Sequence, residues 1–146
     1  MKAARRRRFW APEVIQTSAM DCGPASLKAI LEGFGIQVGY GRLREACSTD
    51  VDGTSIDTLE DVAAELGLDA QQTMVPVDHV VLAEAQVTPC ILTVLSRQGP
   101  GHFVVLWRIH AGLAQVMDPI GGRRWVPVAS LERDILRHAM AVDAEA

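Results

Sequence analysis

The sequence of 146 residues has few aromatic side chains, 5% of the total, against 49% hydrophobic residues, so its core must be mainly aliphatic. It lacks an apolar run long enough to span a bilayer, and no long apolar segment follows the N-terminal arginines, which excludes a secretory signal. It also lacks the Gly-x-x-x-x-Gly-Lys-Ser/Thr loop that binds nucleotide phosphates. We therefore expect a soluble domain that does not hydrolyse nucleotides itself.

Cysteines are few and irregularly spaced. The sequence contains Cys22, Cys47 and Cys90, and an odd number at wide spacing does not suggest a disulfide framework. No Cys-x-x-Cys or His-x-x-x-His pair is present, so a zinc site has little support. We expect no metal or cofactor, and a reducing, cytoplasmic setting.

The charge balance is mildly acidic, with one basic run. A net charge of −4 disfavours nucleic acid as a partner. The exception is the run Arg5, Arg6, Arg7 and Arg8, which precedes Phe9-Trp10. We expect residues 1–12 to form a flexible, solvated basic extension, with a contact to anionic lipid or to a neighbouring domain as the alternative. Residues 13–146 are expected to form a single domain.

Hydrophobic periodicity predicts helices in the first half of the chain and strands in the second. Helical spacing of apolar residues follows Cys22, recurs in residues 41–47, and recurs again from Thr54 or Ser55 to Leu66. Strands are predicted at residues 70–75, 90–95, 103–109, 114–117 and 124–128, and further helices at 77–85 and 130–138. Helices followed by an antiparallel sheet indicate an α+β fold.

Cys22 is the first candidate for chemistry, because Gly23-Pro24-Ala25 opens the helix that follows it. A helix N-terminus and a nearby imidazolium lower the pKa of a thiol and make it a nucleophile. The alternative is a small buried apolar cysteine, and we expect that fate for Cys47 and Cys90, which lie on predicted core faces.

His102 and Asp118 are the second candidate pair. His102 leads into one predicted strand, Asp118 ends the next, and the tight turn Ala111-Gly112 joins the two strands. In an antiparallel hairpin the start of one strand lies beside the end of the other, so the two side chains should be neighbours. An imidazole beside a carboxylate is suited to act as a general base. The alternatives are a loop-edge histidine and a turn aspartate before proline.

Gln16 is the fourth candidate, because it lies a short step upstream of Cys22. A side-chain amide N–H beside the Cys22 backbone N–H would bind the oxyanion of a tetrahedral intermediate. Three apolar residues are weaker candidates for lining a groove and are more commonly core residues: Met20, Trp107 and Trp125. The remaining histidines are interpreted as surface residues: His79, His110 and His138.

Three segments together resemble a known family. They are Gln-x5-Cys-Gly-Pro-Ala from Gln16, Gly-His-Phe-Val-Val-Leu around His102, and Val-Met-Asp-Pro around Asp118. This set resembles the double-glycine leader peptidases that process bacteriocins, which are papain-like cysteine peptidases of peptidase-containing ABC transporters. The resemblance covers about Val14 to Leu131.

The resemblance implies roles for these residues. Cys22 would be the nucleophile, His102 the general base and acid, Asp118 the group that orients His102, and Gln16 part of the oxyanion hole. The substrate would be a precursor peptide whose helical leader ends in a small-residue pair. Transporter membrane and ATPase domains, in cis or in trans, would be partners at the inner face of the cell membrane.

Three other hypotheses remain open at this point. The first is a leader-binding module that does not cleave, as in relatives that lack the cysteine. The second is acyl transfer or amide hydrolysis on another substrate, with the same framework. The third is metal binding through the cysteines, which their spacing disfavours.

Overall fold

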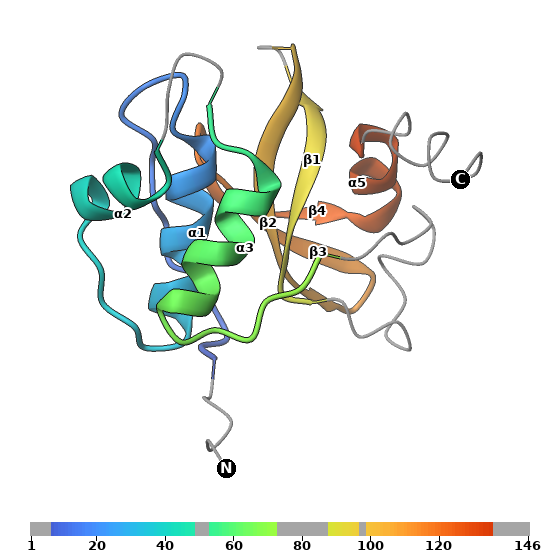
Figure 1. Ribbon diagram of the computed structural model, residues 1–146. Coiled ribbons are helices and arrows are strands. Elements are labelled where there is room, and N and C mark those ends of the chain that lie inside the picture. Colours follow the sequence, from blue (N-terminus) through green and yellow to red (C-terminus); the bar gives the residue numbers. More distant parts are fainter. Residues whose placement is uncertain (1–6, 49–52, 73–87, 97–98, 136–146) are drawn as a thin grey trace.

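The computed structural model describes residues 7–48, 53–72, 88–96 and 99–135 (Figure 1). Its helices and strands follow the predicted order, helices first and an antiparallel sheet afterwards, so the predicted α+β fold is confirmed. Among the described residues, none of the helices combines the length and the hydropathy needed to cross a bilayer.

In the first half of the chain the described residues form three helices: α1 (Cys22–Gly33), α2 (Tyr40–Ala46) and α3 (Ile56–Glu65). Helix α1 ends where Gly35 adopts a φ of +84°, a conformation that glycine allows at a helix C-terminus. At the start of α3 the Ser55 hydroxyl accepts a hydrogen bond from the backbone N–H of Thr58 at 3.2 Å, which confirms the predicted cap.

The described part of the second half contains four strands in one sheet, in the order β1-β2-β3-β4 and all antiparallel: β1 (Cys90–Ser96), β2 (Gly99–His110), β3 (Leu113–Asp118) and β4 (Gly122–Pro127). The β2–β3 hairpin closes on Ala111 and Gly112, with φ angles of 53° and 78°. Two consecutive positive φ values are typical of the two-residue turn that suits the twist of a hairpin.

A β-bulge interrupts the β2–β3 hairpin at Trp107. On the turn side of it, Arg108 pairs with Gln115, whereas on the far side Leu106 pairs with Val116. One residue of β2 therefore has no partner, and the register shifts by one from that point towards the start of the strand.

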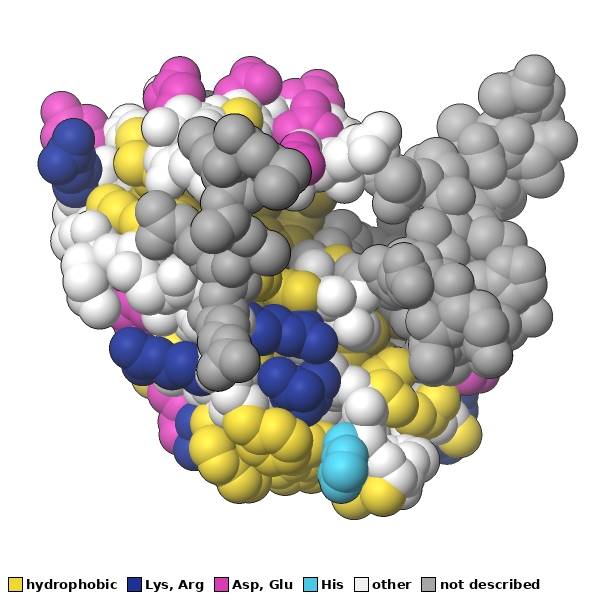
Figure 2. Space-filling view, turned by 90° about the horizontal axis from the view of Figure 1, so that it is seen from below, with side chains coloured by type: hydrophobic (Ala, Val, Ile, Leu, Met, Phe, Trp, Pro, Cys, Tyr) yellow, Lys and Arg dark blue, Asp and Glu magenta, His cyan; other side chains and the backbone are white. Residues whose placement is uncertain are grey.

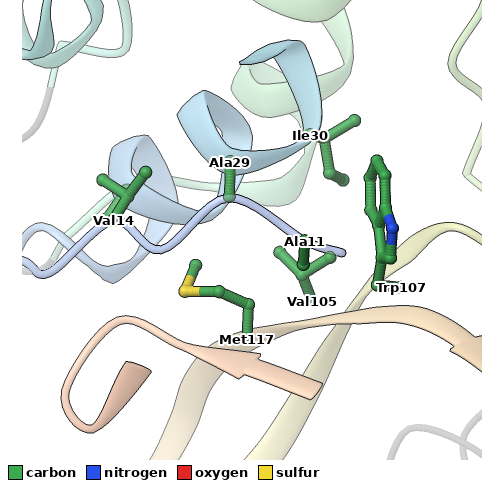
Figure 3. Close-up of a cluster of buried hydrophobic side chains, with 8 residues drawn as sticks. Ala11, Val14, Ala29, Ile30, Val105, Trp107 and Met117 are labelled. Carbon is green, nitrogen blue, oxygen red and sulfur yellow. The ribbon is translucent and has the colours of Figure 1, made fainter. Parts of the chain in front are cut away.

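Helices cover both faces of the sheet. Helices α1, α2 and α3 lie on one face and α5 (Val128–Asp134) on the other (Figure 1). Under α1, the strand residues Val105 and Met117 pack against small side chains such as Ala29 (Figure 3). Under α5, Leu131 packs against a separate cluster of strand residues. The sheet is thus held rigidly between two apolar layers, and its strands can carry fixed side chains at their ends.

The N-terminal segment is part of this fold from Arg7 onward. Arg7 donates to the Trp107 backbone carbonyl at 2.6 Å, and the Trp107 indole N–H donates to the Arg8 carbonyl at 2.9 Å. Ala11 is fully buried, and its backbone N–H donates to Gln115. The expected solvated extension of residues 1–12 is therefore not found in its described part, because residues far along the chain supply hydrogen-bond partners and apolar cover.

Several predicted boundaries also differ from the structure. Helix α5 begins at Val128 rather than at residue 130, and Ala46, expected to face inward, is exposed at the end of α2. Residues 70–72 are not in a strand. The remainder of that predicted strand, the predicted helix at 77–85, and residues His79 and His138 lie outside the described residues.

Candidate active site

Cys22 is the first residue of α1, and its side chain is partly buried. Asp21 is the N-cap residue, and Pro24 lies in the first turn, where its missing N–H costs no hydrogen bond. The backbone N–H of the first helical residue has no acceptor inside the helix. That N–H and the positive end of the helix dipole favour negative charge on the sulfur or on an oxygen held beside it.

His102 and Asp118 form a hydrogen-bonded pair, with 2.8 Å between Nε2 and Oδ1. The predicted adjacency of the two side chains is thereby confirmed. His102 lies inside β2, since that strand begins at Gly99, and not at its entry as the sequence suggested.

The bulge explains why these two side chains meet. Val105 pairs with Met117, so the next residue of β3, Asp118, lies opposite the preceding residue of β2, Val104. Residues opposite each other share a face of the sheet, and so do residues two apart on one strand. His102 and Asp118 are therefore diagonal neighbours on the same face.

The Cys22 thiol and the His102 imidazole interact closely enough to shift the pKa of each other. Because Nε2 of the ring contacts Asp118, Nδ1 is the nitrogen that remains for the sulfur. Asp118 Oδ1 also accepts the backbone N–H of Ile120 at 2.9 Å, which fixes the carboxylate. Thiol, imidazole and carboxylate thus form one set of interacting groups that links α1, β2 and β3.

The electrostatics of this chain favour a thiolate–imidazolium pair. Burial by itself would raise the pKa of Cys22, but hydrogen bonds from His102 and from the backbone of Phe103 and Gly23 outweigh it and hold that pKa below its ordinary value. The hydrogen bonds to Asp118 and Cys22 raise the pKa of His102 to about 9. Burial opposes ionisation of Asp118, yet its bond to His102 keeps the pKa of the carboxyl below the usual range.

Gln16 lies on the loop that leads to Cys22. Its Nε2 donates to the Ser18 backbone carbonyl at 2.9 Å, and its backbone N–H donates to the Pro119 carbonyl at 2.8 Å. Its Oε1 is buried and has no hydrogen-bond partner among the described residues. A side-chain amide has two N–H groups, so the bond to Ser18 leaves the second one available. The oxyanion role of Gln16 stays a prediction.

Asp21 is a second carboxylate at the site. In the sequence it was only the residue before Cys22. It is fully buried and accepts hydrogen bonds from Arg44 Nε at 2.8 Å, Tyr40 at 3.1 Å and Thr17 at 3.2 Å. Burial opposes its charge, but Arg44 and Tyr40 hold its pKa below the ordinary value. These bonds tie the loop between Gln16 and Cys22 to α2. From the sequence alone, a buried aspartate that binds distant side chains cannot be distinguished from an aspartate that only caps a helix.

Of the other cysteines, Cys47 is buried as predicted, whereas Cys90 is only partly buried against the strand residues under α5. Burial raises the pKa of Cys47 to about 11 and that of Cys90 to about 12, so both thiols are inert at neutral pH. His110 is exposed, as predicted. Trp107 is fully buried in the core and does not line a groove, whereas Met20 is 37% exposed. The described residues contain no group of three potential metal ligands.

Comparisons with known proteins agree with this geometry. The sequence model of the Peptidase C39 family matches residues 11–144. The lactococcin-G-processing and transport ATP-binding protein of Lactococcus lactis subsp. lactis is 30% identical over 110 residues, which are 75% of this chain and 16% of that protein. The colicin V secretion/processing ATP-binding protein of Escherichia coli is 26% identical over 122 residues, which are 84% and 16% of the two chains. This chain thus spans about a sixth of the length of these relatives.

Solved structures show the same fold. A double glycine motif protease from an AMS/PCAT transporter, crystallised in complex with the leader peptide, superimposes with a TM-score of 0.76 at 26% identity and covers 89% of each chain. The peptidase domain of Streptococcus ComA, a bi-functional ABC transporter, superimposes with a TM-score of 0.74 at 21% identity, over 84% of this chain and 90% of that one.

Proposed function

Because this chain belongs to the Peptidase C39 family, we propose that it is a cysteine endopeptidase that removes the leader of a bacteriocin or other ribosomally made peptide precursor, cutting after a Gly-Gly-type pair of small residues. The observation that carries the proposal is the hydrogen-bonded pair of His102 and Asp118, with the Cys22 thiol interacting with His102 at the start of α1. The double glycine motif protease with its bound leader supports the choice of substrate.

In the proposed reaction, Cys22 is the nucleophile and His102 the general acid and base. The thiolate attacks the carbonyl carbon of the residue before the cut, and a carbon–sulfur bond forms as the carbonyl oxygen becomes an oxyanion. The tetrahedral intermediate then collapses to a thioester, and the imidazolium of His102 gives its proton to the departing amine. Water, deprotonated by His102, hydrolyses the thioester and restores the thiolate. Asp118 keeps the imidazole oriented and favours its charged form.

Two donors are proposed to hold the oxyanion. One is the backbone N–H of Cys22, which has no acceptor within α1. The other is the second N–H of Gln16 Nε2. Donors that are fixed before the reaction begins stabilise the developing charge without a reorganisation cost, so the loop from Gln16 to Cys22 has to be rigid. The bonds of Asp21 to Arg44 and Tyr40 supply that rigidity.

The setting of the enzyme follows from its relatives and is part of the proposal. Those proteins are described as processing and transport ATP-binding proteins. We therefore place this domain on the cytoplasmic side of the cell membrane, beside transporter membrane and ATPase domains that act in cis or in trans. Thiol–imidazole chemistry requires no cofactor and no nucleic acid.

The test is cleavage of a synthetic leader peptide that ends in Gly-Gly and continues into a short cargo, followed by mass spectrometry. We expect the unmodified chain to cut after the second glycine and Cys22→Ala to be inactive, while Cys47→Ala, which also removes one thiol, stays active. Leader binding by Cys22→Ala, measured by fluorescence anisotropy, shows that the variant is folded. A Cys22→Ala protein that still cuts contradicts the mechanism, and an unmodified chain that binds the leader without cutting it is a binding module.

A further inference from the structure

An aromatic cluster with bound arginines lies at the end of the sheet remote from the candidate active site. The rings of Phe9, Trp10, His110 and Trp125 contact one another, with centroids 5.3 to 6.5 Å apart. Phe9 is 44% exposed and Trp10 is 51% exposed. Two large apolar side chains thus remain open to solvent although they belong to a packed cluster.

Arginines surround these rings in fixed positions. The guanidinium of Arg108 lies 4.6 Å from the centre of the Phe9 ring, and that of Arg123 lies 5.1 Å from the Trp10 ring. Arg108 also donates to the Phe9 carbonyl at 3.0 Å, and Arg123 to the Ala11 carbonyl at 2.8 Å. Because both side chains are already ordered, little side-chain conformational entropy is lost when a ligand binds them.

The face has a charge opposite to that of the whole chain. Arg8 is exposed and directly precedes Phe9 in the chain. Arg108 and Arg123 lie against the Phe9 and Trp10 rings, whereas the net charge of the protein is −4. Figure 2 shows hydrophobic side chains, Lys and Arg side chains and a histidine together in the lower part of the view, with most acidic side chains at the upper edge and a few beside the basic ones. One acidic group, Glu13, lies 3.6 Å from Arg123.

We propose that this surface, made of Phe9, Trp10, Trp125, Arg8, Arg108 and Arg123, docks the domain onto an anionic lipid bilayer. Tryptophan rings partition to the headgroup level of a membrane, where the ring is in a partly apolar layer. Arginines next to them attract anionic headgroups, each contributing about 1 kcal/mol. One exposed aromatic pair and a few cations give a reversible contact, comparable to a peripheral anchor.

The position of the surface leaves the candidate active site accessible. His110, in the aromatic cluster, lies eight residues along β2 from His102, which corresponds to about 26 Å of extended strand. A domain that rests on the bilayer through the cluster therefore keeps Cys22 away from the lipid. This inference does not depend on the proposed peptidase activity.

The experiment is sedimentation of the full chain with phosphatidylcholine vesicles that contain about one third phosphatidylglycerol, compared with vesicles of phosphatidylcholine alone. We expect binding to the anionic vesicles, much weaker binding to the neutral ones, and loss of binding at high salt. Because Trp107 is fully buried, a blue shift of tryptophan fluorescence on binding reports on Trp10 and Trp125.

Variants distinguish binding through this surface from non-specific electrostatic attraction of the protein to the vesicles. Arg8→Gln is expected to weaken binding about fivefold and Arg8→Lys to preserve it, while Trp10→Ala abolishes the fluorescence shift from that residue and also weakens binding. Arg42→Gln, the same change of charge on the exposed face of α2, is the matched control and should bind normally. The proposal is overturned if anionic vesicles do not bind, which leaves the surface for an acidic protein partner. It is also overturned if neutral vesicles bind equally well, or if Arg42→Gln loses as much binding as Arg8→Gln.

Discussion

Replacement of Asp118 by asparagine tests the central ion pair. The substitution keeps the size of the side chain and removes its charge. His102 Nε2 lies 2.8 Å from Asp118 Oδ1, and the two side chains are only 5% and 18% exposed, so solvent screens their interaction weakly. The pKa of His102 is raised from 6.5 to about 9, and the hydrogen bond to Asp118 is the largest cause.

The magnitude follows from that shift. A rise from 6.5 to about 9 corresponds to about 3 kcal/mol in favour of the imidazolium. If Asp118 supplies roughly 2 kcal/mol of it, the alkaline limb of the variant moves down by about 1.5 pH units, and kcat/KM falls by up to about thirtyfold on the alkaline side, before any loss of ring orientation is counted.

The assay is cleavage of a quenched fluorescent leader peptide from pH 5 to pH 10. In the unmodified chain the thiolate–imidazolium pair persists between the lowered pKa of Cys22 and the pKa of His102 at about 9, so activity should fall as pH rises through about 9. In Asp118→Asn the same fall should move to lower pH. Asp134→Asn, on the exposed end of α5, is the control. An Asp118→Asn profile whose alkaline limb stays near pH 9, or a loss of kcat/KM of less than about threefold at pH 9, refutes the reasoning.

Three further predictions concern the surroundings of the site. Iodoacetamide at pH 7 should alkylate Cys22 and spare the other two cysteines, whose pKa values are about 11 and 12, as peptide mapping will show. Asp21→Asn weakens the bond to Arg44 and should lower the free energy of unfolding, measured by urea titration, by about 2 kcal/mol. In cleavage kinetics the same variant should change kcat more than KM. Gly33→Ala should lower the melting temperature, because the new Cβ would overlap the Trp107 ring, whereas Gly41→Ala meets no neighbour and should not.

Local features were predictable from the sequence because they depend on few neighbouring residues. The helix that begins at Cys22, the cap at Ser55 and the turn at Ala111-Gly112 all follow from the preferences of residues within a few positions. The hairpin argument placed His102 and Asp118 near each other at one end of the two strands, but that their side chains share a face depends on the bulge at Trp107, which the sequence did not predict.

Features that depend on distant residues were not predictable. The packing of Arg7 and Ala11 on the sheet requires Trp107 and Gln115, about a hundred positions away in sequence. Likewise, the role of Asp21 emerges only when α2 brings Arg44 beside it. A basic run and a turn aspartate are ordinary surface patterns until such partners are in place.

The bulge at Trp107 sets a parity rule for the candidate site. In an uninterrupted hairpin with a two-residue turn, directly paired residues are an odd number of positions apart in the sequence. Residues on opposite strands that share a face are therefore also an odd number of positions apart, because side chains on one strand alternate between the two faces. His102 and Asp118 are 16 positions apart, an even number, so they can share a face only if one arm of the hairpin contains one unpaired residue. Deletion of a single residue of β2 between Trp107 and the turn would make this separation odd, so the imidazole and the carboxylate would keep a common face only if Trp107 became paired and the bulge were lost. Deletion of two residues would leave the separation even, and the bulge would still be required.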